Sequence, residues 1–219
     1  MKQLLFSLFI LMFLACGETQ KLTETPDLIT FDQEHFVTRW KVGDDLIVKI
    51  TTHLNYDYFY NIDCEGDGEW DGENITGDYL CVYDSPGIYQ VVIVGDFPHF
   101  RGYYAGGDLI TVDNWGLQPW KSFEGSFISC DLLERFEAKD TPYLKRVENM
   151  NYIFWGAGRF NGDLSGWDTS NVKYMNMAFY NATSFNGDIS GWDVSEVTHH
   201  DKFSNSIPEN KQPAFKSKK

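Results

Sequence analysis

Positive charge and catalytic signatures are both scarce in this sequence. It has 18 lysines and arginines against 32 aspartates and glutamates, which gives a formal net charge of −14. Because nucleic acids and anionic membranes attract basic patches, this acidity argues against a nucleic-acid partner and mainly favours solubility. The sequence also has no Gly-x-Ser-x-Gly elbow, no His-Glu-x-x-His motif, no phosphate-binding loop and no dinucleotide fingerprint. We therefore expect a protein that is not an enzyme.

Long apolar runs are missing too, apart from a short one near the N-terminus. Residues 4–14 are apolar and follow Lys2, but they are too few to cross a bilayer as a helix. The run ends at Leu14-Ala15-Cys16-Gly17, which is typical of a lipobox. We predict a lipoprotein signal peptide over residues 1–15 and lipidation of Cys16, so that the exported protein is anchored in a membrane, at the outer membrane or cell surface. An ordinary signal peptide cleaved near Ala15 is the alternative.

Residues 16–33 are polar and without periodicity, and we predict a flexible tether there. Residues 34–95 contain several short runs rich in β-branched and aromatic residues, separated by glycine, aspartate and asparagine turns. Such runs predict a small β-sandwich. Cys64 and Cys81 fall on two of these strands. In an exported protein this pair favours a disulfide over a metal site, with two buried free thiols as the alternative.

The C-terminal half repeats itself. Residues 160–172, Phe-Asn-Gly-Asp-Leu-Ser-Gly-Trp-Asp-Thr-Ser-Asn-Val, return at residues 185–197 as Phe-Asn-Gly-Asp-Ile-Ser-Gly-Trp-Asp-Val-Ser-Glu-Val, an offset of 25 (185 − 160). A fixed period of this length indicates a solenoid of about four coils. The preceding Val-x2-Met-x3-Phe-x2-Ala spacing predicts one or two turns of helix in each coil. Cys130 falls at the small-residue position of this ladder, where a buried, inert thiol is expected.

Residues 160–197 resemble the repeats of BspA-like leucine-rich-repeat surface proteins, whose motif continues with Asn-Val-Thr-Asn-Met where this chain has Glu-Val-Thr-His-His at 196–200. The resemblance is weaker over residues 115–159. Residues 85–93 are similar to the Pro-Gly-x-Tyr-x-Val turn and strand of polycystic-kidney-disease-type immunoglobulin-like domains. The resemblance implies a mixed β/α fold, with an immunoglobulin-like β-sandwich over 34–95. A short leucine-rich-repeat-type solenoid of short strands and short helices would follow over 96–207, and a tail over 208–219.

The same resemblance implies a non-catalytic, lipid-anchored protein for cell-surface binding or adhesion. Its expected partners are the membrane, through the N-terminal lipid, and a host, neighbouring-cell or matrix protein or glycan. A structural envelope lipoprotein without a soluble ligand is the first alternative, and a carbohydrate-active enzyme is the second.

Two groups of residues are candidate sites. Asp63, Glu65, Asp67 and Asp71 lie on a glycine-rich loop, and hard oxygen ligands of this kind suit calcium, although Asn74 stands where an EF-hand-type loop needs glutamate. A solvated acidic hairpin loop is the alternative, and no other cofactor is expected. The second group is the repeated pair of tryptophans, Trp167 and Trp192. They predict an aromatic stripe for carbohydrate or peptide if exposed, and ladder residues packed between coils if not.

Overall fold

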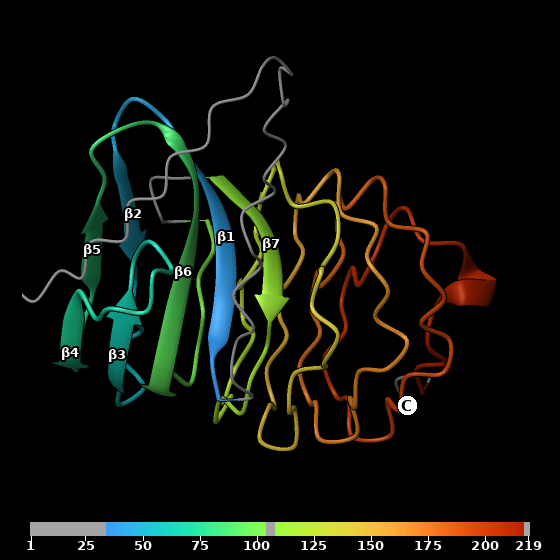
Figure 1. The fold of residues 1–219 in the computed structure, drawn as a ribbon. Coiled ribbons are helices and arrows are strands. Elements are labelled where there is room, and N and C mark those ends of the chain that lie inside the picture. The colour runs from blue at the N-terminus through green and yellow to red at the C-terminus, as the bar shows by residue number, and fades with distance from the viewer. Residues whose placement is uncertain (1–33, 104–107, 217–219) are drawn as a thin grey trace, which may run out of the picture.

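The computed structural model describes residues 34–103 and 108–216, which form two β-sheets followed by a stack of repeated turns (Figure 1). The predicted signal peptide, the lipidation site at Cys16 and the predicted tether lie outside the described residues. Of the helices in the described part, none is long and apolar enough to cross a membrane.

In the described part of the chain, seven strands form two antiparallel sheets. They are β1 (Phe36–Val42), β2 (Ile47–Ile50), β3 (Phe59–Asp63), β4 (Gly72–Ile75), β5 (Tyr79–Val82), β6 (Gly87–Asp96) and β7 (Asp108–Asn114). The larger sheet has the order β4-β3-β6-β1-β7, and β2 pairs with β5 in a separate two-stranded sheet. In β1, Phe36 and Trp40 are fully buried while Arg39 is only partly buried, as the two-residue period of a strand requires.

A disulfide joins the two sheets. Cys64 directly follows β3, and Cys81 lies in β5. Their Cα atoms are 5.6 Å apart, within the range that a disulfide spans without moving the backbone. The predicted disulfide is therefore confirmed.

Strand β7 is the physical link between the sheets and the repeats. Its residues fall in the range predicted for the repeat solenoid, but they pair with β1 as the edge strand of the larger sheet. On its other side the backbone N–H groups of Glu137 and Ala138 both donate to the carbonyl oxygen of Val112, at 3.0 Å. The repeats thus cover the sheet edge that would otherwise be open, and they share one hydrophobic core with the sheets.

Neighbouring turns are held together by an alternating hydrogen-bond pattern. The N–H groups of Met150, Tyr152 and Phe154 donate to carbonyl oxygens of the following turn, at 2.8–2.9 Å. The intervening residues, such as Ile153, donate instead to the carbonyl three residues back in their own turn. Among the described turns, the ladder-like pairings are isolated parallel bridges, for example from Asn149 to Tyr174.

The turns also share two backbone positions with positive φ. One is occupied in successive turns by Gly125, Tyr152, Met177 and Lys202, and the other by Ser129, Gly156 and Asn181. A left-handed residue ends any run of helical conformation. The repeat is therefore a series of tight turns rather than a helix and a strand.

These findings correct the predicted fold. The mixed β/α fold with a leucine-rich-repeat-type solenoid of short strands and short helices is wrong. Across residues 34–103 and 108–216 the chain is nearly all β, with antiparallel sheets and no α-helix, and its one helical element is the 3-10 turn η1 (Glu209–Lys211). The apolar spacing that suggested helices arises because side chains of consecutive tight turns also return to the interior every three to four residues.

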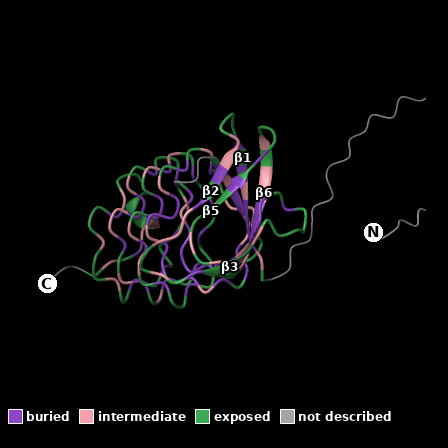
Figure 2. Ribbon diagram, turned by 90° about the vertical axis from the view of Figure 1, so that its left-hand side faces the viewer, coloured by how far each residue is buried: buried purple, intermediate pink, exposed green. Residues whose placement is uncertain are grey.

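The predicted apolar ladder is nevertheless the interior of the stack. The repeated valine, methionine, phenylalanine and alanine positions are all buried, namely Val147, Met150, Phe154, Ala157, Phe160, Val172, Met175, Phe179, Ala182 and Phe185. Figure 2 shows buried and exposed residues alternating around the successive turns. Cys130 is a buried free thiol, as expected, and burial raises its pKa to about 12. Residues 208–216 pack over the last turn, where the ring of Phe215 stacks on His200 with centroids 4.2 Å apart.

Candidate functional site

The two repeated tryptophans are core residues and not a surface stripe. Trp167 and Trp192 are each only 5% exposed. The indole N–H of Trp192 donates to the carbonyl oxygen of Leu164 in the preceding turn, at 3.0 Å. Trp167 packs against Phe136 and against Trp115, which follows β7. The predicted binding stripe at these residues is therefore wrong, and the alternative of packing between turns describes them.

A different set of aromatic rings is exposed on the stack. Tyr152, Trp155 and Tyr174 are 37%, 38% and 37% exposed. They lie on two neighbouring segments, because the N–H of Tyr152 donates to the carbonyl of Asn176 and that of Met150 to the carbonyl of Tyr174. We call these three residues the aromatic face.

The aromatic face extends one turn further through a histidine. The ring of His199 lies 5.1 Å from that of Tyr174, and these two residues are bridge partners on adjacent turns. Sequence reasoning missed the face because it followed the two repeated tryptophans, Trp167 and Trp192. The available signal was the aromatic pair Trp155 and Tyr180, which are also 25 residues apart (180 − 155).

The acidic loop is organised around one buried carboxylate. Asp63 is 2% exposed, and its two oxygens accept hydrogen bonds from the backbone N–H groups of residues 65, 66, 67 and 68, at 2.7–3.4 Å. Asp71 accepts the N–H of Cys64 at 2.7 Å. Glu65 and Asp67 are exposed, and Asp67 accepts the N–H of Glu69 at 3.0 Å. The loop thus satisfies its backbone with its own aspartates. Among the described residues, no group of three histidine, cysteine or acidic side chains is placed to hold a metal ion.

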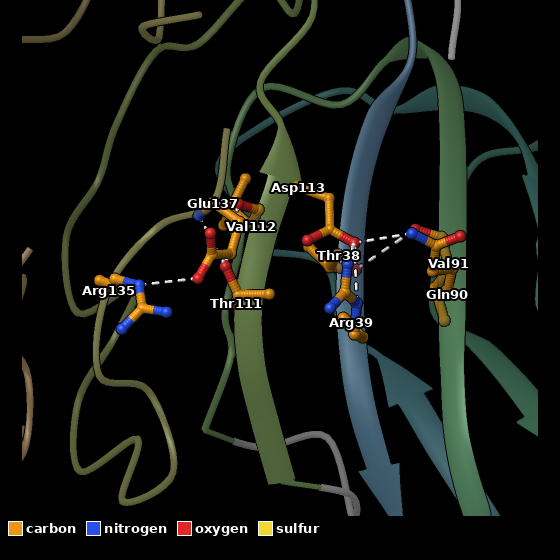
Figure 3. Close-up of polar contacts among 9 residues, drawn as sticks. All are labelled: Thr38, Arg39, Gln90, Val91, Thr111, Val112, Asp113, Arg135 and Glu137. Atoms are coloured by element: carbon orange, nitrogen blue, oxygen red, sulfur yellow. Dashed lines mark hydrogen bonds and ion pairs between the residues drawn. The ribbon is translucent and has the colours of Figure 1, made fainter. Parts of the chain in front are cut away.

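Three of the described arginines lie together where the sheet meets the repeats, and Figure 3 shows two of them, Arg39 and Arg135. A pocket of about 340 Å³ is lined there by Arg39, Arg135 and Arg159 together with the acids Glu134 and Glu137. Arg39 on β1 pairs with Asp113 on β7, with Nε and Nη2 at 3.0 and 2.8 Å from the same carboxylate oxygen. That oxygen also accepts a hydrogen bond from the Gln90 side chain on β6, at 2.7 Å. We call this the arginine pocket.

Another hollow, of about 380 Å³, lies at the end of β7, against the first repeat turns. It contains the exposed side chains of Leu117 and Tyr143 and the ion pair of Lys145 with Asp168, at 2.5 Å. The hydrogen bonds from Lys145 and Ser170 lower the pKa of Asp168 to about 2, so this carboxylate is ionised at any physiological pH and cannot serve as a proton donor.

Comparison with known proteins places the repeat part of the chain. Residues 112–215 match a family described as "Mycoplasma protein of unknown function, DUF285". The matched segment begins inside β7 and runs through the whole stack of turns to the residues that cover its end. No curated protein and no solved structure gives a match.

Proposed function

We propose that this protein is a non-catalytic, lipid-anchored surface protein of the BspA-like kind, which binds a partner through the aromatic face of its repeats. The observation that carries the proposal is that Tyr152, Trp155 and Tyr174 are exposed on adjoining turns. The repeated tryptophans Trp167 and Trp192, by contrast, are buried. The repeat motif at residues 160–197 and the match over residues 112–215 support the same class.

Exposed tyrosine and tryptophan on a rigid scaffold favour protein binding. These residue types are enriched at binding hot spots because they offer a large apolar area and lose little rotamer entropy on binding. Each of the three residues is hydrogen-bonded through its backbone to one neighbouring turn, so the backbone that carries the rings is fixed before a partner arrives. The expected partner is a protein on a host or neighbouring cell or in the matrix. Three rings make a small face, so many copies anchored in one membrane would strengthen attachment by multivalency.

Two measurements on whole cells test the proposal. A protease added outside intact cells should remove the full-length protein, and Cys16→Ala should release it from the membrane. If the protein is protected from the protease and the Cys16→Ala variant behaves like the wild type, both the lipid anchor and the adhesion role are refuted. The protein would then be an envelope protein without an external ligand.

Attachment to host or neighbouring cells then tests the aromatic face. The double variant Tyr152→Ser/Tyr174→Ser should lower attachment at least about tenfold, since two hot-spot residues together contribute roughly 2 kcal/mol or more. The matched control is Tyr143→Ser, which removes an even more exposed ring (56%) outside the aromatic face. Equal attachment by all three proteins contradicts the assignment of the binding surface.

A further inference from the structure

We propose that the arginine pocket binds a hydroxylated carboxylate, with a uronic acid residue as the ligand class that fits its lining. The pocket combines side chains from three parts of the chain, namely Arg39 from β1, Arg135 from the first repeat turn and Arg159 from the next. Its volume of about 340 Å³ is at the lower end of the range for small-molecule sites. This site is separate from the aromatic face and does not depend on the function proposed for it.

Arg39 is the fixed part of the pocket. Its partner Asp113 has a side chain only 8% exposed, and the pair is tied to three strands because Gln90 donates to the same oxygen. Both guanidinium contacts with Asp113 come from Nε and Nη2, so Nη1 takes no part in the pair. A guanidinium held in this way is preorganised, and little rotamer entropy is lost when a ligand binds it.

Arg135 and Arg159 are the exchangeable part. Their side chains are 64% and 58% exposed, and they pair with the exposed carboxylates of Glu137 and Glu134. Exposed ion pairs of this kind contribute at most about 1 kcal/mol, so a ligand carboxylate can replace a glutamate at little cost. The fork of N–H donors on an arginine matches both oxygens of a carboxylate.

Glu134 and Glu137 make the pocket selective among anions. Glu134 and Glu137 remain in the lining, and in a chain of net charge −14 they repel a multiply charged group such as a phosphate. Once displaced from the arginines, they accept hydrogen bonds from hydroxyl groups. Ile110 and Leu132 supply apolar walls for the C–H surface of a ring. One negative charge, several hydroxyls and a compact carbon skeleton together describe a sugar acid.

The test is a calorimetric titration of the full chain with sodium glucuronate at constant ionic strength, with glucose as the uncharged control. A ligand of about 13 non-hydrogen atoms at roughly 0.3 kcal/mol per atom gives a Kd of about 1 mM. Glucose should bind at least about tenfold more weakly, because it lacks the carboxylate that the arginines recognise. Equal affinity for the two sugars, or no heat from glucuronate at about ten times that concentration, overturns the proposal.

Variants locate the site. Arg135→Gln/Arg159→Gln should raise the Kd for glucuronate at least about tenfold, since it removes two charge-assisted contacts. Both side chains are exposed, so the fold should persist, and the thermal midpoint of the variant verifies this. The matched control is Lys173→Gln, which breaks the pair with Glu148, an ion pair between turns with the same spacing as Arg159 and Glu134 but outside the pocket. Loss of binding in the control, or none in the double variant, refutes the assignment.

A further titration distinguishes a free sugar acid from the end of an acidic glycan as the ligand. Methyl β-glucuronide carries a substituent where a glycan chain would continue. Binding of both compounds identifies the end of an acidic glycan as the ligand, whereas binding of glucuronate alone identifies a free sugar acid. Tyr152→Ser/Tyr174→Ser should bind glucuronate as the wild type does, so failure of this proposal and failure of the proposed attachment surface are distinguished.

Discussion

The buried histidine at the junction of sheet and repeats predicts how stability depends on pH. The ring of His99 is 1% exposed, and its Nε2 lies 2.8 Å from the carbonyl oxygen of Glu124, to which it donates. Its other nitrogen, Nδ1, is buried and has no hydrogen-bond partner among the described residues. Burial lowers the pKa of His99 from 6.5 to about 4; the hydrogen bond to the Glu124 carbonyl opposes this shift in part, and the nearby positive charge of Arg101 adds a smaller lowering.

The sign follows from which state binds the proton. The folded pKa is depressed, so between about pH 6.5 and pH 4 the unfolded chain is protonated at this residue while the folded chain is not. Stability is therefore lost as the pH falls through this window. A shift of this size corresponds to about 3 kcal/mol in total, of which about 2 kcal/mol is lost between about pH 7 and pH 4.5. Burial also lowers the pKa of His53, which adds to the loss in the same direction.

The assay is urea unfolding at several pH values in this range, with His99→Gln as the variant. Glutamine keeps an N–H donor for the Glu124 carbonyl and does not titrate. We expect the loss of stability between about pH 7 and pH 4.5 to be smaller in His99→Gln by about 2 kcal/mol, whatever its absolute stability at pH 7. His199→Gln is the matched control, since it makes the same substitution at an exposed histidine away from the junction. An unchanged pH dependence in His99→Gln would refute the reasoning.

Two further predictions concern the disulfide and a residue with a left-handed backbone conformation. The disulfide closes a loop with a sequence separation of 17, so Cys64→Ala/Cys81→Ala should lower the free energy of unfolding by about 3 kcal/mol in a urea titration, and reductant should lower that of the wild type similarly. A change in the double variant below about 1 kcal/mol would show that the link between the sheets contributes little. Lys202 is exposed and has φ of +53°, at a position where the first turn has Gly125, so Lys202→Gly should stabilise the protein by about 1 kcal/mol. Glu196→Gly, at an exposed residue outside the left-handed region, should instead be neutral or destabilising, and equal effects of the two substitutions would contradict the strain argument.

The candidate binding surfaces were harder to predict from the sequence than the buried core of the repeats. Trp167 and Trp192 drew attention because they recur, yet recurrence in a repeat first reflects the shared core. The arginine pocket has no signature in the sequence at all, since Arg39 and Arg159 are 120 positions apart (159 − 39) and meet only because β7 joins the sheet to the turns. The carboxylates of residues 63–73 looked like calcium ligands, but the glycines among them let backbone N–H groups turn toward Asp63.

The sequence by itself indicated the repeat period, the identity of the buried ladder and most of the strands before it, and it favoured a disulfide between Cys64 and Cys81. These features depend on apolar periodicity and on local turn residues, which can be read along the chain. Only the tertiary structure decided that the repeats form no helices and that β7 belongs to the sheet. A backbone N–H such as that of Tyr152 can donate a hydrogen bond within its own segment, as in a helix, or to a carbonyl of the next turn, as it does here. The local spacing of apolar residues is compatible with either arrangement. The choice is made by the neighbouring turn, whose carbonyl groups are present only once the stack has formed.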